Sequence, residues 1–208
     1  MKTRSKALLL MLCAVSLVTA SVLGTMAYLT STAEVKNTFA VGSVSITMDE
    51  EDVDNDSDTS DNVTVDGVVR DKANSYKLMP GHTYTKDPII HVGSGSEDCY
   101  LFVKVVDEIS EIEADTTVAA QMADMGWVKV DGTENVYVYT IDKQNPAVVT
   151  ASADVTVFES FTVRGDVTGS VLEGYKDKTI TVTAYAVQKD GFETKTASQI
   201  WDTAFPGK

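Results

Sequence analysis

The sequence predicts an all-β fold, a sandwich or a barrel of antiparallel strands with one or two short helices. Short runs of Val, Ile, Thr, Tyr and Phe are separated by Gly, Asp, Asn and Pro, which is typical of short strands joined by turns. Several runs alternate apolar and polar residues with period two, which indicates strands with one buried face. About 180 residues follow an N-terminal leader, enough for one core, so a single domain is expected.

The first strand is expected over residues 43–48, in which Val, Ile and Met alternate with Ser and Thr. Residues 49–62 follow it directly and carry Asp or Glu at most positions, which predicts a solvated acidic loop. Val63–Val69 predicts two short strands around a turn at Asp66-Gly67. Further on, Pro80-Gly81 suits the two central positions of a type II turn.

Two longer strands are expected in the middle of the chain. Thr83–Val92 is the first, and Lys86-Asp87-Pro88 within it suits the opening of an edge strand. Cys99–Val105 is the second, with Phe102 and Lys104 on the face opposite the other apolar residues.

One helix is expected over Asp115–Met125. Asp115 is a suitable N-cap, apolar residues recur at roughly helical spacing, and Gly126 follows as a stop signal. The tail Thr196–Phe205 is expected to add a turn. The remaining strands are expected at Trp127–Val130 and Asn135–Ile141 around an Asp131-Gly132 turn, at Val155–Val163 and at Thr179–Ala186.

The first 27 residues have the composition of a signal peptide. Lys2, Arg4 and Lys6 form a positively charged n-region, and Ala7–Leu23 forms an apolar h-region. The chain is therefore expected to be exported, with residues 28–208 as one mature domain.

Cleavage is predicted between Ala27 and Tyr28, because the small residues Thr25 and Ala27 satisfy a signal peptidase. Val18-Thr19-Ala20 has the same spacing but would leave an apolar overhang. An uncleaved N-terminal anchor is the alternative, since the apolar stretch approaches the roughly 20 residues that span a bilayer. Cys13 lies inside the h-region after a large residue and is not expected to carry a lipid.

The charge of the mature chain argues against two classes of partner. Removal of residues 1–27 leaves 14 Lys and Arg against 31 Asp and Glu, a net charge of −17. Nucleic acids and anionic membranes bind proteins largely through cations, so neither is an expected partner. An acidic surface does favour solubility and the uptake of divalent cations.

Cys99 is the one cysteine left after leader removal, so no internal disulfide is expected. An odd cysteine in an exported protein suggests a reactive thiol or a bridge between chains. Its place in a strand pattern favours a small buried apolar side chain instead.

The motifs of the chain resemble those of the TasA/camelysin family of exported proteins. The most specific part is the N-terminal fifty residues, and the match touches most of the chain. The motifs are Gly24-Thr25-Met26-Ala27-Tyr28-Leu29-Thr30, Asn37-Thr38-Phe39-Ala40-Val41-Gly42-Ser43-Val44, Leu78-Met79-Pro80-Gly81-His82, Lys86-Asp87-Pro88, the stretch from Ser96 to Val105, and Val182-Thr183-Ala184-Tyr185-Ala186-Val187-Gln188.

The resemblance implies a jelly-roll-like β-sandwich, processed by a signal peptidase of the SipW type and secreted to the cell surface or the biofilm matrix. In such families, fibres form when the freed N-terminal segment completes the sheet of the next subunit. The corresponding donor strand here is Tyr28–Val41, and its apolar side chains are expected to fill a neighbour's groove. The alternative is that this segment pairs within its own sheet. The donor side chains are Tyr28, Leu29, Val35, Phe39 and Val41.

Some members of this family carry a metallopeptidase label, but these residues do not favour an enzyme. His82 and His91 are the only histidines, and neither lies in a His-Glu-x-x-His helix. No nucleophile elbow or phosphate-binding loop is present in the sequence, and Glu97 and Asp98 are expected to raise the pKa of Cys99. No catalytic residue, resident metal or cofactor is expected.

Calcium is the one ligand that the acidic loop suggests. Asp52, Asp54, Asp56 and Asp58 alternate, as carboxylates do in calcium loops. The EF-hand pattern fails. Whether the loop is counted from Asp52 or from Asp54, its sixth residue is not glycine and its twelfth is not glutamate. Weak calcium binding is therefore an alternative to a flexible charged loop.

Three functions follow from these observations, in order of preference. The first is a self-assembling structural protein, whose partners are further copies of itself or other matrix or surface proteins. The second is a monomeric extracellular binding module that uses the same export route. A secreted metallopeptidase is third.

Overall fold

The computed structural model describes residue 6 and residues 11–16, 42–54, 62–65 and 67–208. The chain divides into two compact units, Met1–Val41 and Gly42–Lys208. In the first unit residues 11–16 are helical, and the predicted cleavage site and the predicted donor strand lie outside the described residues. Within the described part of the chain, no helix has the length and apolar character needed to cross a bilayer.

The second unit is an all-β sandwich, as the sequence predicts. One sheet has the strand order β2-β3-β1-β5-β9 and the other β11-β6-β8-β7, with a short β10-β4 pair. Each described strand pair is antiparallel. The strands are β1 (Ile46–Glu51), β2 (Val63–Val65), β3 (Val68–Asp71), β4 (Thr83–Thr85), β5 (Ile89–Val92), β6 (Cys99–Asp107), β7 (Trp127–Lys129), β8 (Val136–Tyr139), β9 (Asp154–Thr156), β10 (Ser160–Thr162) and β11 (Ile180–Gln188).

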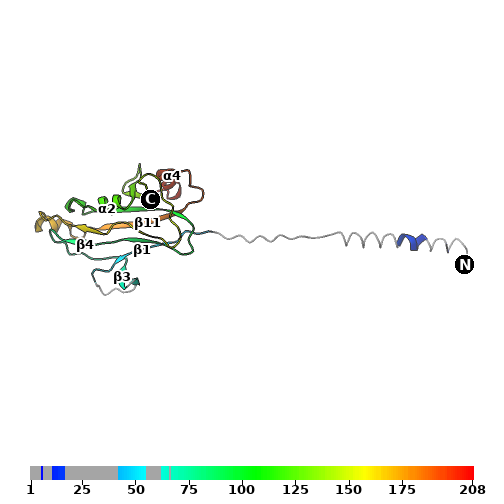
Figure 1. The fold of residues 1–208 in the computed structure, drawn as a ribbon, viewed down its shortest axis with the longest axis horizontal. Coiled ribbons are helices and arrows are strands. Elements are labelled where there is room, and N and C mark those ends of the chain that lie inside the picture. The colour runs from blue at the N-terminus through cyan, green and yellow to red at the C-terminus, as the bar shows by residue number, and fades with distance from the viewer. Residues whose placement is uncertain (1–5, 7–10, 17–41, 55–61, 66) are drawn as a thin grey trace. The chain divides into compact units, whose positions relative to one another are not determined.

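The helices are short and lie between or after the strands. They are η1 (Ser110–Ile112), α2 (Val118–Asp124), α3 (Gly169–Leu172), η2 (Glu173–Tyr175) and α4 (Ala197–Ala204). Figure 1 shows α4 on the outer side of the layer that contains β11, and β3 on the opposite side of the domain.

Two predicted strands are each divided. Thr83–Val92 forms β4 and β5, because Pro88 has no N–H for the ladder. Val155–Val163 divides opposite this break into β9 and β10. Two backbone hydrogen bonds join the two segments at the break, from Lys86 N to Glu159 O at 3.1 Å and from Val157 N to Pro88 O at 2.9 Å.

The domain has two hydrophobic clusters. The main one lies between the sheets and includes Leu101, Val103 and Val105 of β6. The second lies on the other face of β6, where Phe102 is fully buried beside Ile200 and Trp201 of α4. The expectation of one buried face per strand is therefore wrong for β6. The described residues of both clusters lie within Gly42–Lys208, so this unit has a core of its own.

The tail forms a full helix where the sequence predicted only a turn. Thr196 and Gln199 form a reciprocal capping box at the start of α4. The burial of Ile200 and Trp201 against β6 then supplies the packing that a short helix needs.

Helix α2 begins later than predicted. The side chain of Thr117, in place of Asp115, accepts the capping hydrogen bond from the Ala120 N–H. Gly126 ends the helix as predicted, with φ of +93°, and a Cβ there would lie 2.3 Å from the Thr140 carbonyl oxygen. Only glycine fits this close approach.

The first residues of the predicted acidic loop are in a strand. Asp49, Glu50 and Glu51 belong to β1, and Glu50 is only 4% exposed. Its Oε2 lies 2.6 Å from Nζ of Lys86, so the buried carboxylate is paired. The prediction of a solvated loop is wrong for these three residues.

Candidate functional site: an open groove between two sheet edges

One edge of the first sheet is only partly covered. Strand β1 pairs with β5 from Ile46 to Asp49, but with β3 only at Glu50 and Glu51. Within the described residues, no strand pairs with the other side of the Ile46–Asp49 segment. Its outward backbone groups can therefore accept a further strand.

The second sheet has an open edge too. Strand β11 pairs with β6 along its whole length, from Ile180 to Gln188. Its other side has no strand neighbour in the described part of the chain. The nine residues of this edge extend over about 30 Å.

The apolar side chains of these two edges are incompletely buried. They pack against the main cluster, yet each keeps part of its surface exposed, whereas the facing residues of β5 and β6 are almost fully buried. The core is therefore open between β1 and β11. The half-buried residues are Val44, Ile46, Met48, Ile180, Val182, Ala184 and Ala186.

The opposite side of the sandwich is covered. Gln121 of α2 donates from Nε2 to the Ser160 carbonyl at 2.7 Å and accepts from the N–H groups of Glu159 and Ser160. Trp127 Nε1 donates to the Thr156 carbonyl at 2.9 Å. Side chains thus satisfy the backbone of β9 and β10 and protect this edge from pairing with another chain.

A cavity of about 780 Å³ lies where the two open edges meet. Met48 of β1 and Ile180 and Val182 of β11 line it, and the segment from Asp71 to Leu78 forms one side. Its lining mixes these apolar side chains with several lysines and acids. The cavity is therefore suited to an amphipathic extended segment as well as to a small ligand.

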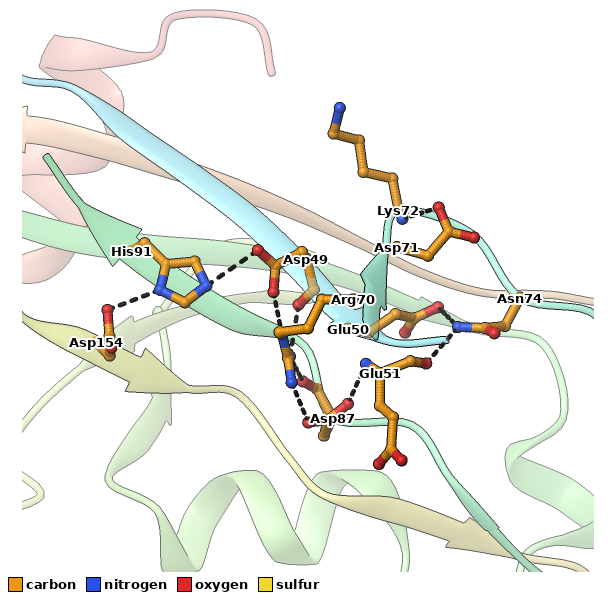
Figure 2. A network of polar contacts seen from close by, with 10 residues as sticks. All are labelled: Asp49, Glu50, Glu51, Arg70, Asp71, Lys72, Asn74, Asp87, His91 and Asp154. Carbon is orange, nitrogen blue, oxygen red and sulfur yellow. Dashed lines mark hydrogen bonds and ion pairs between the residues drawn. The ribbon is translucent and has the colours of Figure 1, made fainter. Parts of the chain in front are cut away.

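A polar network anchors the β2–β3 hairpin beside this groove (Figure 2). Arg70 of β3 is 6% exposed and donates to the Asp87 carboxylate from Nη1 at 2.9 Å and from Nε to the Asp49 carboxylate. Its Nη2 donates to the Asp87 carbonyl at 3.0 Å. One guanidinium thus joins β3 to β1 and to the turn before β5.

His91 extends the network across the outer face of the first sheet (Figure 2). Its Nε2 lies 3.1 Å from the Asp49 carboxylate, and its Nδ1 lies 2.7 Å from that of Asp154. Burial lowers the pKa of His91, but the contacts with Asp154 and Asp49 outweigh it, so the pKa is raised. His91 thus links β5 to β1 and β9 through two carboxylates.

Among the described residues, His82, His91 and Cys99 lie in separate surroundings. His82 lies in the turn after Gly81, where its N–H donates to the Met79 carbonyl at 3.3 Å as a type II turn requires. Among the described residues, no group of three or more His, Cys, Asp or Glu side chains is arranged to hold a metal. Of the four alternating aspartates that suggested calcium, Asp52 and Asp54 are described. Asp54 accepts from the Ser75 N–H at 2.6 Å. The other two, Asp56 and Asp58, lie outside the described residues.

Cys99 is completely buried, as its place in the strand predicts. Burial and the charge of Asp98 raise the pKa of its thiol to about 11. We expect residues 42–208 to resist iodoacetamide at pH 8 and to react fully once unfolded in denaturant, because only an exposed thiolate is nucleophilic. Glutathione is the reference for an unhindered thiol. Modification of the folded protein at the glutathione rate would contradict this placement.

Sequence reasoning missed both the open edges and the anchor at Arg70. Edge strands are defined by long-range pairing, which no local pattern reports. Arg70 did carry a usable signal, because it directly follows the two valines of β3 in a chain with few Lys and Arg.

Comparison of the chain with family models, with curated proteins and with solved structures finds no match.

Proposed function

We propose that this protein is an exported structural subunit of the cell surface or extracellular matrix, which assembles head to tail by strand donation. The observation that supports it most is the open groove between β1 and β11, where two strand edges and a half-covered core meet. The donor is Tyr28–Val41 of the next copy, released when a SipW-type peptidase removes the leader. The proposed role requires no catalytic group or cofactor.

The donor segment is long enough to cover the acceptor edge. An extended segment of 14 residues spans about 46 Å, which exceeds the roughly 30 Å edge of β11. A donor can therefore run along the whole edge and still reach back to its own domain, which begins at Gly42.

The chemistry of the donor also suits this groove. Leu29, Val35 and Phe39 supply apolar side chains for the half-buried residues of the two edges. The side chains of the segment carry one acid, Glu34, and one base, Lys36, so they add no net charge to a strongly acidic protein. Subunit contact through it adds no net charge repulsion at the groove.

A monomeric binding module is the second candidate, and the volume of the groove favours it. Small-molecule sites usually enclose about 300–1,000 Å³, and this cavity falls within that range. The two functions differ in whether the groove holds a segment of another copy or a diffusible ligand.

The first test compares residues 28–208 with residues 42–208 by analytical ultracentrifugation and negative-stain microscopy. We expect the longer protein to form sedimenting fibres and the shorter one to stay monomeric, because only the longer one carries the donor. Circular dichroism should show the same folded domain in both. A strictly monomeric 28–208 protein, across protein and calcium concentrations, would exclude self-assembly and favour the binding module.

A synthetic peptide of residues 28–41 tests the groove directly, by fluorescence anisotropy against residues 42–208. Phe39→Asp should abolish binding, because it puts a charge among the apolar residues of the core. Thr38→Asp is the matched control and should bind, because successive strand residues face opposite ways. Equal binding of both variant peptides, or of a scrambled one, would argue against strand donation.

A further inference from the structure

Two acidic side chains meet in a buried corner that the proposed assembly does not use. Asp107 ends β6, and Glu113 follows η1 and forms a bridge with Val163 after β10. Glu113 is 5% exposed, and its carboxyl group interacts with that of Asp107. The corner therefore connects the second sheet to the end of the β10 ribbon.

The hydrogen bonds of Glu113 are incomplete if both groups are ionised. Its Oε2 accepts from the Val118 N–H at 3.1 Å, at the start of α2. Its Oε1 is buried, and no donor among the described residues reaches it. Two carboxylates can only accept, so their contact is favourable only when one of them carries a proton.

No cation neutralises the pair in the structure as described. Arg164, which follows Val163, is engaged by the Asp166 carboxylate and the Glu111 carbonyl. Lys178, which precedes β11, is bound to Glu108. Tyr137 of β8 faces Asp107 as a neutral phenol, and the charge of Asp107 adds to burial in raising its pKa.

We propose that Asp107 and Glu113 share one proton in the folded domain near neutral pH, with Glu113 as the donor. The proton supplies the partner that Oε1 lacks, while Oε2 still caps α2. Raising the pH removes this proton and sets two like charges against each other in a buried corner. The pair is thus a pH-sensitive joint between the second sheet, the end of the β10–β4 pair and α2, and it is independent of strand donation.

The acid–base properties of both groups agree with this arrangement. Burial, the charge of Asp107 and the hydrogen bond with Asp107 raise the pKa of Glu113 to about 7, against a lowering by the Val118 N–H. Burial also raises the pKa of Asp107, although the Ile109 N–H and Glu113 hydrogen bonds oppose it.

The sign of the effect on stability follows from proton linkage. The folded state holds a proton that the unfolded state releases near the ordinary glutamate pKa of 4.5. This contribution to stability is therefore complete below this value and is lost as the pH rises towards about 7. The unfolding equilibrium constant should increase by up to about tenfold per pH unit in this window. The loss of stability from His91 begins only above its ordinary pKa of 6.5, so the lower part of the window reports on the Asp107–Glu113 pair.

The test uses a protein of residues 42–208, which contains both clusters and lacks the donor. Its urea unfolding is measured between pH 5 and pH 8. Glu113→Gln should remove the pH dependence between pH 5 and 6.5, because its amide is a permanent donor to Asp107. Glu134→Gln, at an exposed site, is the matched control and should keep it. A Glu113→Gln protein with the unchanged pH dependence would overturn the proposal.

A second measurement needs no variant of Glu113. Carboxyl ¹³C shifts of the unmodified domain should show Glu113 titrating near pH 7, and Asp107→Asn should move this midpoint to lower pH. A midpoint for Glu113 near 4.5 in the unmodified domain would show that no proton is shared, and would equally overturn the proposal.

Discussion

Phe102→Ala is expected to lower the free energy of unfolding of residues 42–208 by about 3–5 kcal/mol, which is the usual cost of deleting a buried aromatic ring. Phe102 is completely buried. Its ring centroid lies 5.6 Å from that of Trp201 and 6.1 Å from that of Phe205. The space left by the missing ring therefore lies under α4, and the substitution loosens the helix as well as the sheet. Urea unfolding gives the magnitude, and hydrogen exchange of the α4 amides shows the local effect.

Val106→Ala is the control in the same strand. Val106 is 38% exposed, so its truncation should cost at most about 1 kcal/mol and leave α4 protected. If Phe102→Ala were equally mild, the second cluster would contribute little to the stability of the domain, and α4 would be a peripheral element.

Arg70→Met is expected to cost about 3–5 kcal/mol, because it removes the guanidinium that bridges the partly buried carboxylates of Asp49 and Asp87. The hairpin of β2 and β3 should respond most, since β3 joins β1 at only two residue pairs. Loss of the guanidinium should raise hydrogen exchange in Val63–Val65 and Val68–Asp71 before other strands change. Urea unfolding and exchange measured by NMR check the two effects separately.

Lys143→Met provides the comparison with an exposed pair. Lys143 lies 3.8 Å from Asp124, and both side chains are more than half exposed, so the change should cost less than about 1 kcal/mol. Equal effects of the two variants would mean that burial of Arg70 adds nothing to its ion pairs. Arg70→Lys should be intermediate, because an ammonium group cannot reproduce the forked contacts of a guanidinium.

The parts of the fold that depend on local chemistry were predictable. The hairpin of β2 and β3, the hairpin of β7 and β8 around Asp131-Gly132, and the alternate residues of β1 and β11 that face the main cluster are present as the sequence predicts. So is the end of α2 at Gly126. In each of these cases the signal and the structure lie within a few residues of one another, so no distant contact has to be known.

The features that were missed depend on distant residues. The sequence placed Phe102 on the face of its strand opposite the other apolar residues. The burial of this face could not be predicted, because the helix that covers it lies about 100 residues later in the chain. Asp49–Glu51 looked solvated, because Arg70 and Lys86, their buried cationic partners, are not adjacent in sequence. The open groove is likewise set by the strand order, which a single sequence does not report.

The pairing of β6 with β11 also sets the order of events in folding. This longest ladder joins residue 99 to residue 188, so one wall of the main core is absent until nearly the whole chain is available. Closing so large a loop before any contact rewards it makes folding slow, typically milliseconds to seconds for sandwiches of this kind. A chain that lacks β11 therefore cannot form this wall of the main core, however well its earlier strands pair.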